Sequence, residues 1–190
     1  MNTVTVDFLV ENFKKYNNII FNNELPIIPI KLGRSLKTTG YYKSKINRFT
    51  RDIINCEIVI SIAYKKTYKD IIDVLVHEML HYYIAYKKIK DTSSHGIVWT
   101  RLANEINKKY GLNIQQYSYN NEINKNVVKK VRMVEFMYNG KLQLMKVSKN
   151  FNVSTLKPLY GVDFVREYMS NDKNHILMRT SVKILHFINA

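Results

Sequence analysis

Hydrophobic residues recur at intervals of three or four in three stretches of the chain, which is the spacing of an amphipathic helix. The stretches cover residues 5–21, 67–87 and 97–110, and Gly111 is the residue type that commonly ends a helix. Acidic residues near the start of the first two stretches favour helices there, because the amino end of a helix carries partial positive charge. The pattern therefore predicts three helices.

Shorter segments with strand-like composition lie between the first two predicted helices. Residues 27–34, 39–46 and 56–62 are rich in β-branched or aromatic residues, and Pro26 begins an extended stretch because it disfavours a helical conformation at the residue before it. Three short strands predict a small antiparallel or mixed sheet. Helices packed on such a sheet make an α+β fold.

A polar stretch, SYNNEINKN at residues 118–126, contains few hydrophobic residues and is interpreted as a linker. It separates a first domain of residues 1–117 from a basic, β-rich C-terminal module of residues 127–190. These boundaries predict a chain of two parts.

Within the C-terminal module, Asn139-Gly140 is a dipeptide typical of tight hairpin turns. It lies between the strand-like segments VVKKVRMVEF and KLQLMKV, so we expect a β-hairpin there. Residues 161–169 predict a short helix, and residues 175–188 predict a closing strand.

The composition agrees with an ordinary globular protein. The chain has 190 residues, of which 46% are hydrophobic, enough to fill a core. It contains no apolar run of about 18 residues and no N-terminal secretory signal, so we expect a soluble, cytoplasmic protein with no membrane partner. Cys56 is the only cysteine, which excludes an internal disulfide and a cysteine-built zinc site; its position in the apolar run NCEIVISI predicts a buried structural thiol.

Positive charge is the second strong feature of the composition. There are 30 Lys and Arg against 15 Asp and Glu, a net charge of +15, and such a field attracts polyanions such as nucleic acid. AT-rich coding is an alternative explanation, because the chain is also rich in Asn, Ile, Tyr and Lys. Between positions 31 and 51 there are seven basic residues and no acidic one, and these are the candidate nucleic-acid contacts: Lys31, Arg34, Lys37, Lys43, Lys45, Arg48 and Arg51.

The C-terminal module is denser in positive charge than the rest of the chain. Its residues Arg132, Lys141 and Lys146 either contact phosphate or keep a small module soluble, and the sequence supports both interpretations equally.

The segment His77-Glu78-Met79-Leu80-His81 has the pattern H-E-x-x-H inside the second predicted helix. Residues four apart project from the same face of a helix, so both imidazoles can bind one metal ion. Glu78 can then act as a general base on a water molecule that zinc has made more acidic. The motif predicts one zinc ion per chain, with Glu78 as the catalytic residue.

A catalytic zinc site normally has three protein ligands and one position for water, so a third ligand is required. His95 is the best candidate, because it lies beyond the polar loop KIKDTSSHG and directly before the third predicted helix, from which the chain can return to His81. Glu105 on that helix is a weaker alternative. His175 and His186 lie in the C-terminal module and are interpreted as surface or core histidines.

The region VLVHEMLHYYIAYKKIKDTSSHGIVWTRLANEI, residues 74–106, resembles the SprT-like metallopeptidases, a family that includes the DNA–protein crosslink protease Spartan. The family shows H-E-x-x-H, a loop, and a His-Gly pair followed by an aromatic residue and a helix. In this chain the pair is His95-Gly96 and the aromatic residue is Trp99. Two upstream segments, FNNELP and KTTGYY, look like the end of the family's entry helix and its glycine-containing strand.

The resemblance implies a zincin-like metallopeptidase domain with His77, His81 and His95 as zinc ligands and Glu78 as the base. It also implies a protein substrate associated with DNA, either single-stranded or duplex, and it is compatible with a place at the nucleoid. Many members carry a cysteine-built zinc ribbon after the protease domain. This chain lacks those cysteines, and the C-terminal module takes the place of the ribbon.

Two rival functions stay open beside a zinc endopeptidase that acts on DNA-associated proteins. The first is a metallopeptidase that cleaves a regulatory or repressor protein, as in the ImmA-like family, and the loop to His95 argues against it. The second is a non-catalytic DNA-binding protein with a structural zinc, and Glu78 argues against it, because structural zinc needs no adjacent base. Tyr82, Tyr83 and Tyr86 lie near the motif, although packing is the commoner role of such tyrosines.

Overall fold

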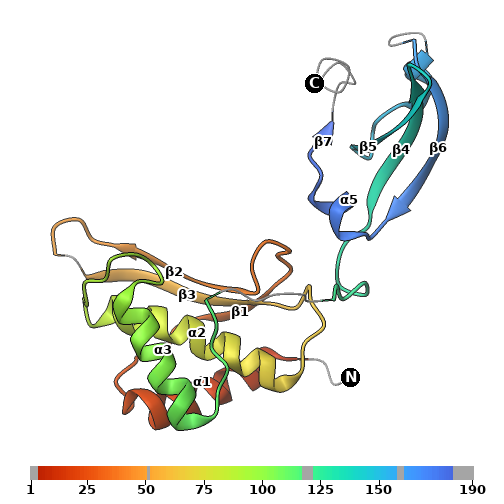
Figure 1. Ribbon diagram of the computed structural model, residues 1–190. Coiled ribbons are helices and arrows are strands. Elements are labelled where there is room, and N and C mark those ends of the chain that lie inside the picture. The colour runs from red at the N-terminus through yellow and green to blue at the C-terminus, as the bar shows by residue number, and fades with distance from the viewer. Residues whose placement is uncertain (1–3, 51, 117–121, 158–160, 182–190) are drawn as a thin grey trace. The chain divides into compact units, whose positions relative to one another are not determined.

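The computed structural model describes residues 4–50, 52–116, 122–157 and 161–181, and the chain divides into two compact units (Figure 1). The first unit is Met1–Val127 and the second is Val128–Ala190. Both combine helices with strands, so the chain has the α and β content that the sequence predicts. None of the helices in the described part of the chain has the length and apolarity that crossing a bilayer requires.

The first unit begins with helix α1, Val6–Phe21. Its amino end is capped by Thr5, whose hydroxyl accepts a hydrogen bond from the backbone N–H of Phe8 at 3.1 Å. The helix ends where Asn22 adopts a left-handed conformation, with φ 52°. Leu9 and Phe13 are completely buried and anchor α1 in the core.

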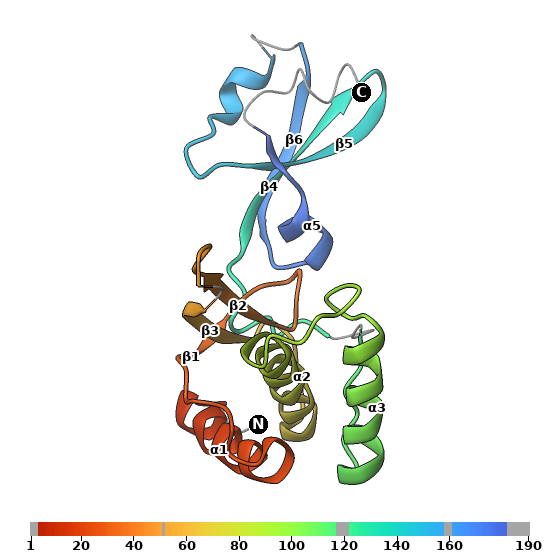
Figure 2. The same ribbon diagram turned by 90° about the vertical axis from the view of Figure 1, so that its left-hand side faces the viewer.

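A three-stranded mixed sheet follows, built from β1 (Ile30–Gly33), β2 (Gly40–Ile46) and β3 (Ile53–Ser61). The strand order is β1-β3-β2, with β1 parallel and β2 antiparallel to β3. All three helices of this unit lie on one face of the sheet (Figures 1 and 2). The sheet therefore has one face covered by helices, and β2 lies at one of its edges.

Helix α2, Tyr68–Tyr86, starts at a capping box in which Thr67 and Asp70 satisfy each other's backbone groups. Helix α3, Ile97–Tyr110, ends at Gly111, which has φ 66°. Both helices occupy the ranges that the hydrophobic pattern predicts. Their buried side chains complete one core with those of α1 and the sheet, and the largest completely buried members are Phe13, Leu9, Ile58, Ile60, Leu75 and Met79.

The second unit is a four-stranded sheet with its own core. The strands are β4 (Val131–Tyr138), β5 (Lys141–Val147), β6 (Asp163–Ser170) and β7 (Thr180–Ser181), in the order β6-β4-β5-β7. The predicted hairpin is present as β4 and β5, joined through Asn139 and Gly140 with φ 48° and 70°. A short 3-10 helix, Val153–Thr155, and helix α5, Lys173–Leu177, complete the unit, whose core is formed by Val134, Phe136, Met145, Val147, Leu156 and Val162.

The predicted helix at residues 161–169 is wrong, because most of that segment belongs to β6. β6 pairs antiparallel with β4, and Arg166 forms an ion pair with Glu135 of β4 at 2.7 Å. Pairing satisfies the backbone groups on one side of β4, and this tertiary requirement overrides the local sequence pattern.

The first part of the predicted closing strand at residues 175–188 is wrong. Its first residues belong to α5, which Asp172 caps by accepting the backbone N–H of Asn174 at 2.8 Å. The strand β7 starts only at Thr180, and residues 182–188 lie outside the described residues. Of the predicted linker, the structure describes residues 122–126, where Ile123 is buried and forms a bridge with Tyr64 of the first unit.

Asn17 generates a testable prediction for the stability of the first unit. Its buried side chain donates to the carbonyl of Leu25 at 2.8 Å and accepts from the N–H of Leu25 at 3.1 Å. We expect Asn17→Ala to lower the free energy of unfolding by about 1–3 kcal/mol, because both backbone groups of Leu25 lose their partner. Urea denaturation measures this change.

The neighbouring Asn18 provides the control, since it is exposed and its side chain accepts a hydrogen bond from the side chain of Asn23, which is also exposed. Asn18→Ala should change the free energy of unfolding by no more than about 0.5 kcal/mol. Equal losses in the two variants would show that the link to Leu25 contributes nothing specific.

Candidate metal centre

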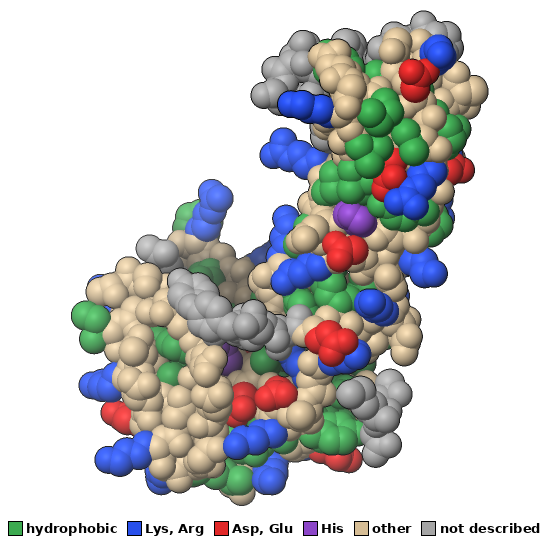
Figure 3. Space-filling view, turned by 45° about the vertical axis from the view of Figure 1, so that its right-hand side comes forward, with side chains coloured by type: hydrophobic (Ala, Val, Ile, Leu, Met, Phe, Trp, Pro, Cys, Tyr) green, Lys and Arg blue, Asp and Glu red, His purple; other side chains and the backbone are tan. Residues whose placement is uncertain are grey.

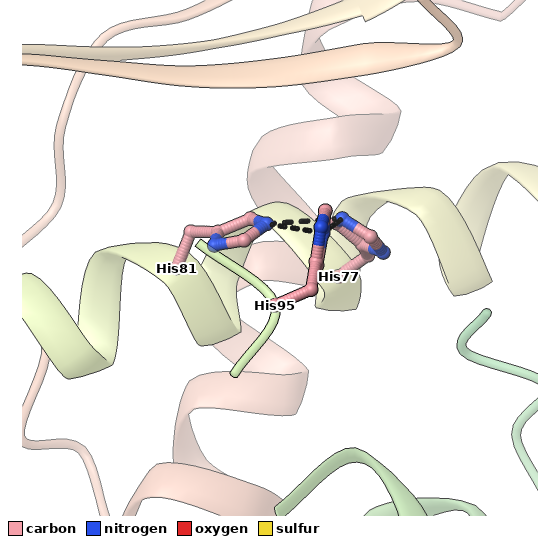
Figure 4. Close-up of side chains that lie close together, drawn as sticks. All are labelled: His77, His81 and His95. Atoms are coloured by element: carbon pink, nitrogen blue, oxygen red, sulfur yellow. Dashed lines mark hydrogen bonds between the residues drawn. The ribbon is translucent and has the colours of Figure 1, made fainter. Parts of the chain in front are cut away.

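Two histidines project from the same side of helix α2. His77 and His81 are separated by about one helical turn, and their Nε2 atoms lie 3.1 Å apart (Figure 4). The opposite side of α2 is buried, with Leu75, Val76 and Met79 in the core. The amphipathic pattern of this helix thus directs both imidazoles to the same open side.

The third histidine, His95, comes from the loop before α3. Its Nε2 lies 3.0 Å from that of His81 and 3.1 Å from that of His77. Zn–N bonds of about 2.0–2.1 Å at tetrahedral angles place ligand nitrogens about 3.3 Å apart. The three nitrogens therefore lie within a few tenths of an ångström of the spacing that a tetrahedral ion requires, and the cluster is close enough to hold a metal.

Hydrogen bonding and burial prepare these rings to act as ligands. The carbonyl of Gln115 lies 3.0 Å from Nδ1 of His77, and because a carbonyl only accepts, the hydrogen of this ring is on Nδ1 and Nε2 keeps its lone pair. Desolvation, followed by the charge of a neighbouring histidine, lowers the pKa of His77 to about 4 and that of His81 to about 3. Desolvation also lowers the pKa of His95. The rings are neutral at pH 7, as metal binding requires.

Trp99 packs against all three rings. Its ring centroid lies 4.8 Å from that of His77, 5.6 Å from that of His81 and 4.4 Å from that of His95, and only 2% of Trp99 is exposed. The indole supports one side of the cluster and limits the rotation of the imidazoles, which reduces the conformational entropy lost when they bind an ion.

The loop that carries His95 is held by the carboxylate of Asp91. This carboxylate accepts the backbone N–H groups of Thr92 at 2.7 Å, Val98 at 3.2 Å and Trp99 at 2.8 Å, so it caps the start of α3 from outside the helix. Desolvation alone would raise the pKa of Asp91, but these donors more than compensate, and its pKa lies below the usual value.

The Asp91 cap requires a glycine at position 96. A Cβ atom at this position would collide with the carboxylate of Asp91 and the hydroxyl of Thr92, so only glycine lets the chain pass between His95 and α3.

Glu78 is the buried acidic residue beside the histidines, with 5% of its surface exposed. Gly40 at the start of β2 lies directly against it, since a Cβ at Gly40 would come within 2.9 Å of Glu78 Oε1. Desolvation raises the pKa of Glu78 to about 8, although the backbone N–H of Tyr42 and the charge of Lys66 act in the opposite direction. A carboxyl group with this pKa exchanges its proton readily near neutral pH.

Lys66 is a half-buried neighbour of Glu78. Its Nζ lies 3.5 Å from the carbonyl oxygen of Thr39, and burial lowers its pKa to about 8, while the charges of Asp70 and Glu78 raise it. It supplies positive charge on the Glu78 side of the cluster.

Other residues proposed from the sequence lie away from this cluster. Glu105 is 64% exposed in its side chain and lies 3.9 Å from Arg101 on α3. His175 is in the second unit, where its Nδ1 lies 2.7 Å from the hydroxyl of Ser170, and His186 lies outside the described residues. An open pocket runs from His95 along α3 and is lined partly by Ile97, Thr100, Arg101, Asn104 and Glu105.

The tyrosines that follow the motif have packing roles. Tyr82 is buried and donates its hydroxyl to the carbonyl of Pro26 at 3.2 Å, and Tyr83 packs against Phe21 with ring centroids 5.2 Å apart. Tyr86 is 40% exposed at the end of α2 and packs against Tyr82. Cys56 is half-buried rather than buried as predicted, and desolvation raises the pKa of its thiol, as expected for an unreactive cysteine.

The basic candidates are exposed where the structure describes them, and Arg51 lies outside the described residues. Lys31 on β1 forms an ion pair with Glu57 on β3 at 2.6 Å. The others lie on separate segments: Arg34 and Lys37 follow β1, Lys43 and Lys45 are on β2, and Arg48 is in the turn after β2. Lys and Arg side chains are spread over the visible surface rather than gathered in one patch (Figure 3).

The comparison with family models places the site in a known context. The model of the SprT-like family matches residues 9–120, which is more than half of the chain and includes every residue of the histidine cluster. The chain belongs to the SprT-like family. No curated protein matches the chain.

The SprT-like region thus coincides with the first unit, apart from the chain before residue 9 and after residue 120. The family is associated with metal, and this member brings three histidines together at a suitable spacing. The second unit lies beyond the matched region, and its sequence contains no cysteine from which a zinc ribbon could be built.

Four features of this SprT-like site were not identified as such from the sequence: the Asp91 cap, the Gln115 carbonyl, the approach of Gly40 to Glu78, and Lys66. An aspartate shortly before a predicted helix is a recognisable capping signal, so Asp91 was accessible in principle. The other three depend on contacts between distant segments, which local patterns do not report.

The third ligand gives a direct test. We expect the 190-residue chain to bind one zinc ion. His95→Ala should lower zinc affinity by at least about 100-fold, because loss of a ligand should exceed the loss caused by an outer-shell partner. Elemental analysis and competition with a chromophoric chelator measure this. His175→Ala is the control and should bind zinc as the wild type does; unchanged affinity in His95→Ala would remove His95 from the ligand set.

Asp91 gives a second test. We expect Asp91→Ala to lower the urea midpoint and to weaken zinc binding by roughly tenfold, because α3 loses its cap and the loop no longer holds His95 in place. Asp91→Asn keeps one side-chain oxygen as an acceptor and should lie between Asp91→Ala and the wild type in both measurements. If zinc affinity is the same in all three proteins, the cap does not position the ligand.

Proposed function

We propose that this chain is a zinc-dependent endopeptidase that acts on proteins associated with DNA. The observation that carries the proposal is the combination of three neutral histidines at tetrahedral spacing with a buried carboxyl group, Glu78, one residue after the first of them. Membership of the SprT-like family is consistent with peptidase activity.

His77, His81 and His95 would hold the zinc ion. When bound, zinc acts as a Lewis acid that makes a water molecule acidic and polarises a carbonyl group. Three protein ligands would leave one coordination position of a four-coordinate ion for water, which is the pattern of a catalytic rather than a structural site.

Glu78 carries the proton-transfer chemistry in this proposal. Its carboxylate accepts a proton from the attacking water and passes it to the nitrogen of the leaving amine. Burial raises the pKa of Glu78, which makes its carboxylate a stronger base, while the backbone N–H of Tyr42 and the charge of Lys66 favour the ionised form that the reaction needs, and a bound zinc ion would favour it further. Glycine at position 40 makes room for the Glu78 carboxyl group, because a Cβ atom there would come too close to it.

The position of β2 supports an extended peptide as the substrate. β2 is an edge strand of its sheet, and Gly40 and Tyr42 on it lie beside Glu78. A peptide segment that paired with this edge would pass next to the carboxyl group. Such a segment needs no free terminus, which favours an endopeptidase over an exopeptidase.

The net charge of +15 supports DNA as the place where the substrate is found. Most of the basic candidates between positions 31 and 51 are exposed side chains of the unit that carries the histidines. A metallopeptidase that cleaves a regulatory or repressor protein would use the same histidines and Glu78 without requiring DNA. A structural zinc site would usually have a fourth protein ligand, whereas the cluster in the described residues has three.

Glu78→Gln tests the proposal. We expect this variant to keep its zinc and to cleave a denatured protein substrate at least about 100-fold more slowly, because glutamine cannot accept the proton. Glu24→Gln is the control, since Glu24 forms a surface ion pair with Lys87, and it should cleave at the wild-type rate. Cleavage is followed by gel electrophoresis with and without single-stranded DNA.

The outcomes separate the three functions. Cleavage only in the presence of DNA supports the proposal, and cleavage that DNA does not affect points to a peptidase with a different target. A wild-type protein that binds zinc but cleaves nothing points to a structural site. If Glu78→Gln retains full activity, the assignment of the base is wrong.

A further inference from the structure

The turn between β2 and β3 exposes a phenylalanine almost completely. Phe49 is 97% exposed, the highest value among the exposed large hydrophobic residues. Burial of an aromatic ring in the core is stabilising, so a phenylalanine this exposed contributes nothing of that kind to the fold. The turn is at the far end of the β2–β3 hairpin, which projects at the left of the first unit (Figure 1).

Hydrogen bonds within the turn hold this ring outward. The side-chain oxygen of Asn47 accepts the backbone N–H groups of Phe49 at 2.8 Å and Thr50 at 3.2 Å. The backbone N–H of Asn47 in turn donates to the carbonyl of Asp52 at 2.8 Å. These bonds fix the backbone at Asn47, Phe49 and Thr50, so less backbone freedom is lost there when Phe49 binds a partner.

Strand β2 continues this surface with one aromatic and two basic residues at every second position. Tyr41, Lys43 and Lys45 are exposed, whereas Tyr42 and Ser44 between them are partly buried. Tyr42 stacks on Tyr82 of α2, so the alternate residues project from the sheet face opposite the helices.

We call Tyr41, Lys43, Lys45, Arg48 and Phe49 the hairpin track. Lys43 and Lys45 are about 6.8 Å apart along the strand, a spacing that suits successive phosphates of an extended nucleic acid. Two acidic residues lie nearby: Glu57 is opposite Lys43 on β3 and forms an ion pair with Lys31, and Asp52 forms one with Lys88, so each has a basic partner outside the track.

We propose that the hairpin track binds single-stranded nucleic acid, with a base stacked on Phe49 and phosphates on Lys43, Lys45 and Arg48. Every base has a π face, and only a single strand offers it to a protruding ring without prior unstacking. A membrane surface is a poorer match, because membrane-bound segments have a continuous apolar face, whereas the exposed residues from Tyr41 to Phe49 include Lys43, Lys45 and Arg48 between the apolar ones.

The hairpin track would be the surface through which the proposed endopeptidase contacts DNA, so its biological role rests on the proposed function. Its test requires no peptidase activity, because binding is measured on the zinc-loaded 190-residue chain with no protein substrate present. Failure of proteolysis and failure of binding are therefore distinguishable.

The experiment is fluorescence anisotropy with a labelled oligodeoxythymidylate, titrated at several salt concentrations. We expect Phe49→Ala to weaken binding by roughly 5- to 100-fold, the size of one base–aromatic stacking contact, and to leave the salt slope unchanged. Lys45→Ala should weaken binding and reduce the magnitude of the slope of log K against log salt by about 0.7, the value for one phosphate contact on a single strand. Phe49→Trp should restore binding.

Ile27→Ala is the matched control, because Ile27 is 60% exposed and lies outside the hairpin track; it should bind as the wild type does. All variants alter exposed side chains, and their urea midpoints should equal that of the wild type. The inference is overturned if Phe49→Ala binds the oligonucleotide as Ile27→Ala does. Duplex DNA and phosphatidylserine vesicles serve as competing ligands in parallel titrations. The inference is also overturned if duplex DNA binds as tightly as the oligonucleotide and Phe49→Ala does not change its affinity. Loss of affinity in Phe49→Ala for the vesicles alone overturns it as well.

Discussion

Helix α2 is buried along one side, and the rest of the first unit is arranged around that constraint. Its buried side, with Leu75 and Met79, is held between the sheet and the other helices. Since the helix cannot rotate without exposing these residues, the direction of every other side chain on it is determined. His77 and His81 therefore lie on the open side, and Glu78 is brought against Gly40 at the edge of the sheet. The packing of α2 in the core therefore also determines the geometry of the candidate site.

Local patterns predicted the parts of the fold that local forces determine. The helices α1, α2 and α3 have strong hydrophobic periods and recognisable ends, such as Thr67 and Gly111, and the hairpin of β4 and β5 has its Asn139-Gly140 turn. β6 was mistaken for a helix because its residues are mostly exposed on both faces, so the two-residue period of a half-buried strand is absent. Its conformation comes from pairing with β4, which lies some thirty residues earlier in the chain.

The same distinction applies to the candidate site. The four-residue spacing of His77 and His81 is a property of one helix, and the sequence was sufficient to bring those two together. His95 required an assumption about how a loop returns, and the structure places its Nε2 within 3.1 Å of the other two. The contacts of Glu78 with β2 and of His77 with the Gln115 carbonyl join segments that lie far apart in the chain. No periodicity or motif in one sequence encodes those contacts, because they arise from packing.

The Asp91 cap affects which parts of this fold can change in sequence and length during evolution. The groups that hold His95 all lie between Asp91 and Trp99, and they bond mainly to one another. The preceding residues, from Lys87 to Lys90, make none of these bonds: their backbone hydrogen bonds run back to the end of α2, and their side chains form surface ion pairs, which contribute little to stability. Insertions or deletions there leave the third histidine in place while they remodel the approach to it. Selectivity for different targets can therefore evolve in this segment without loss of the metal ligands.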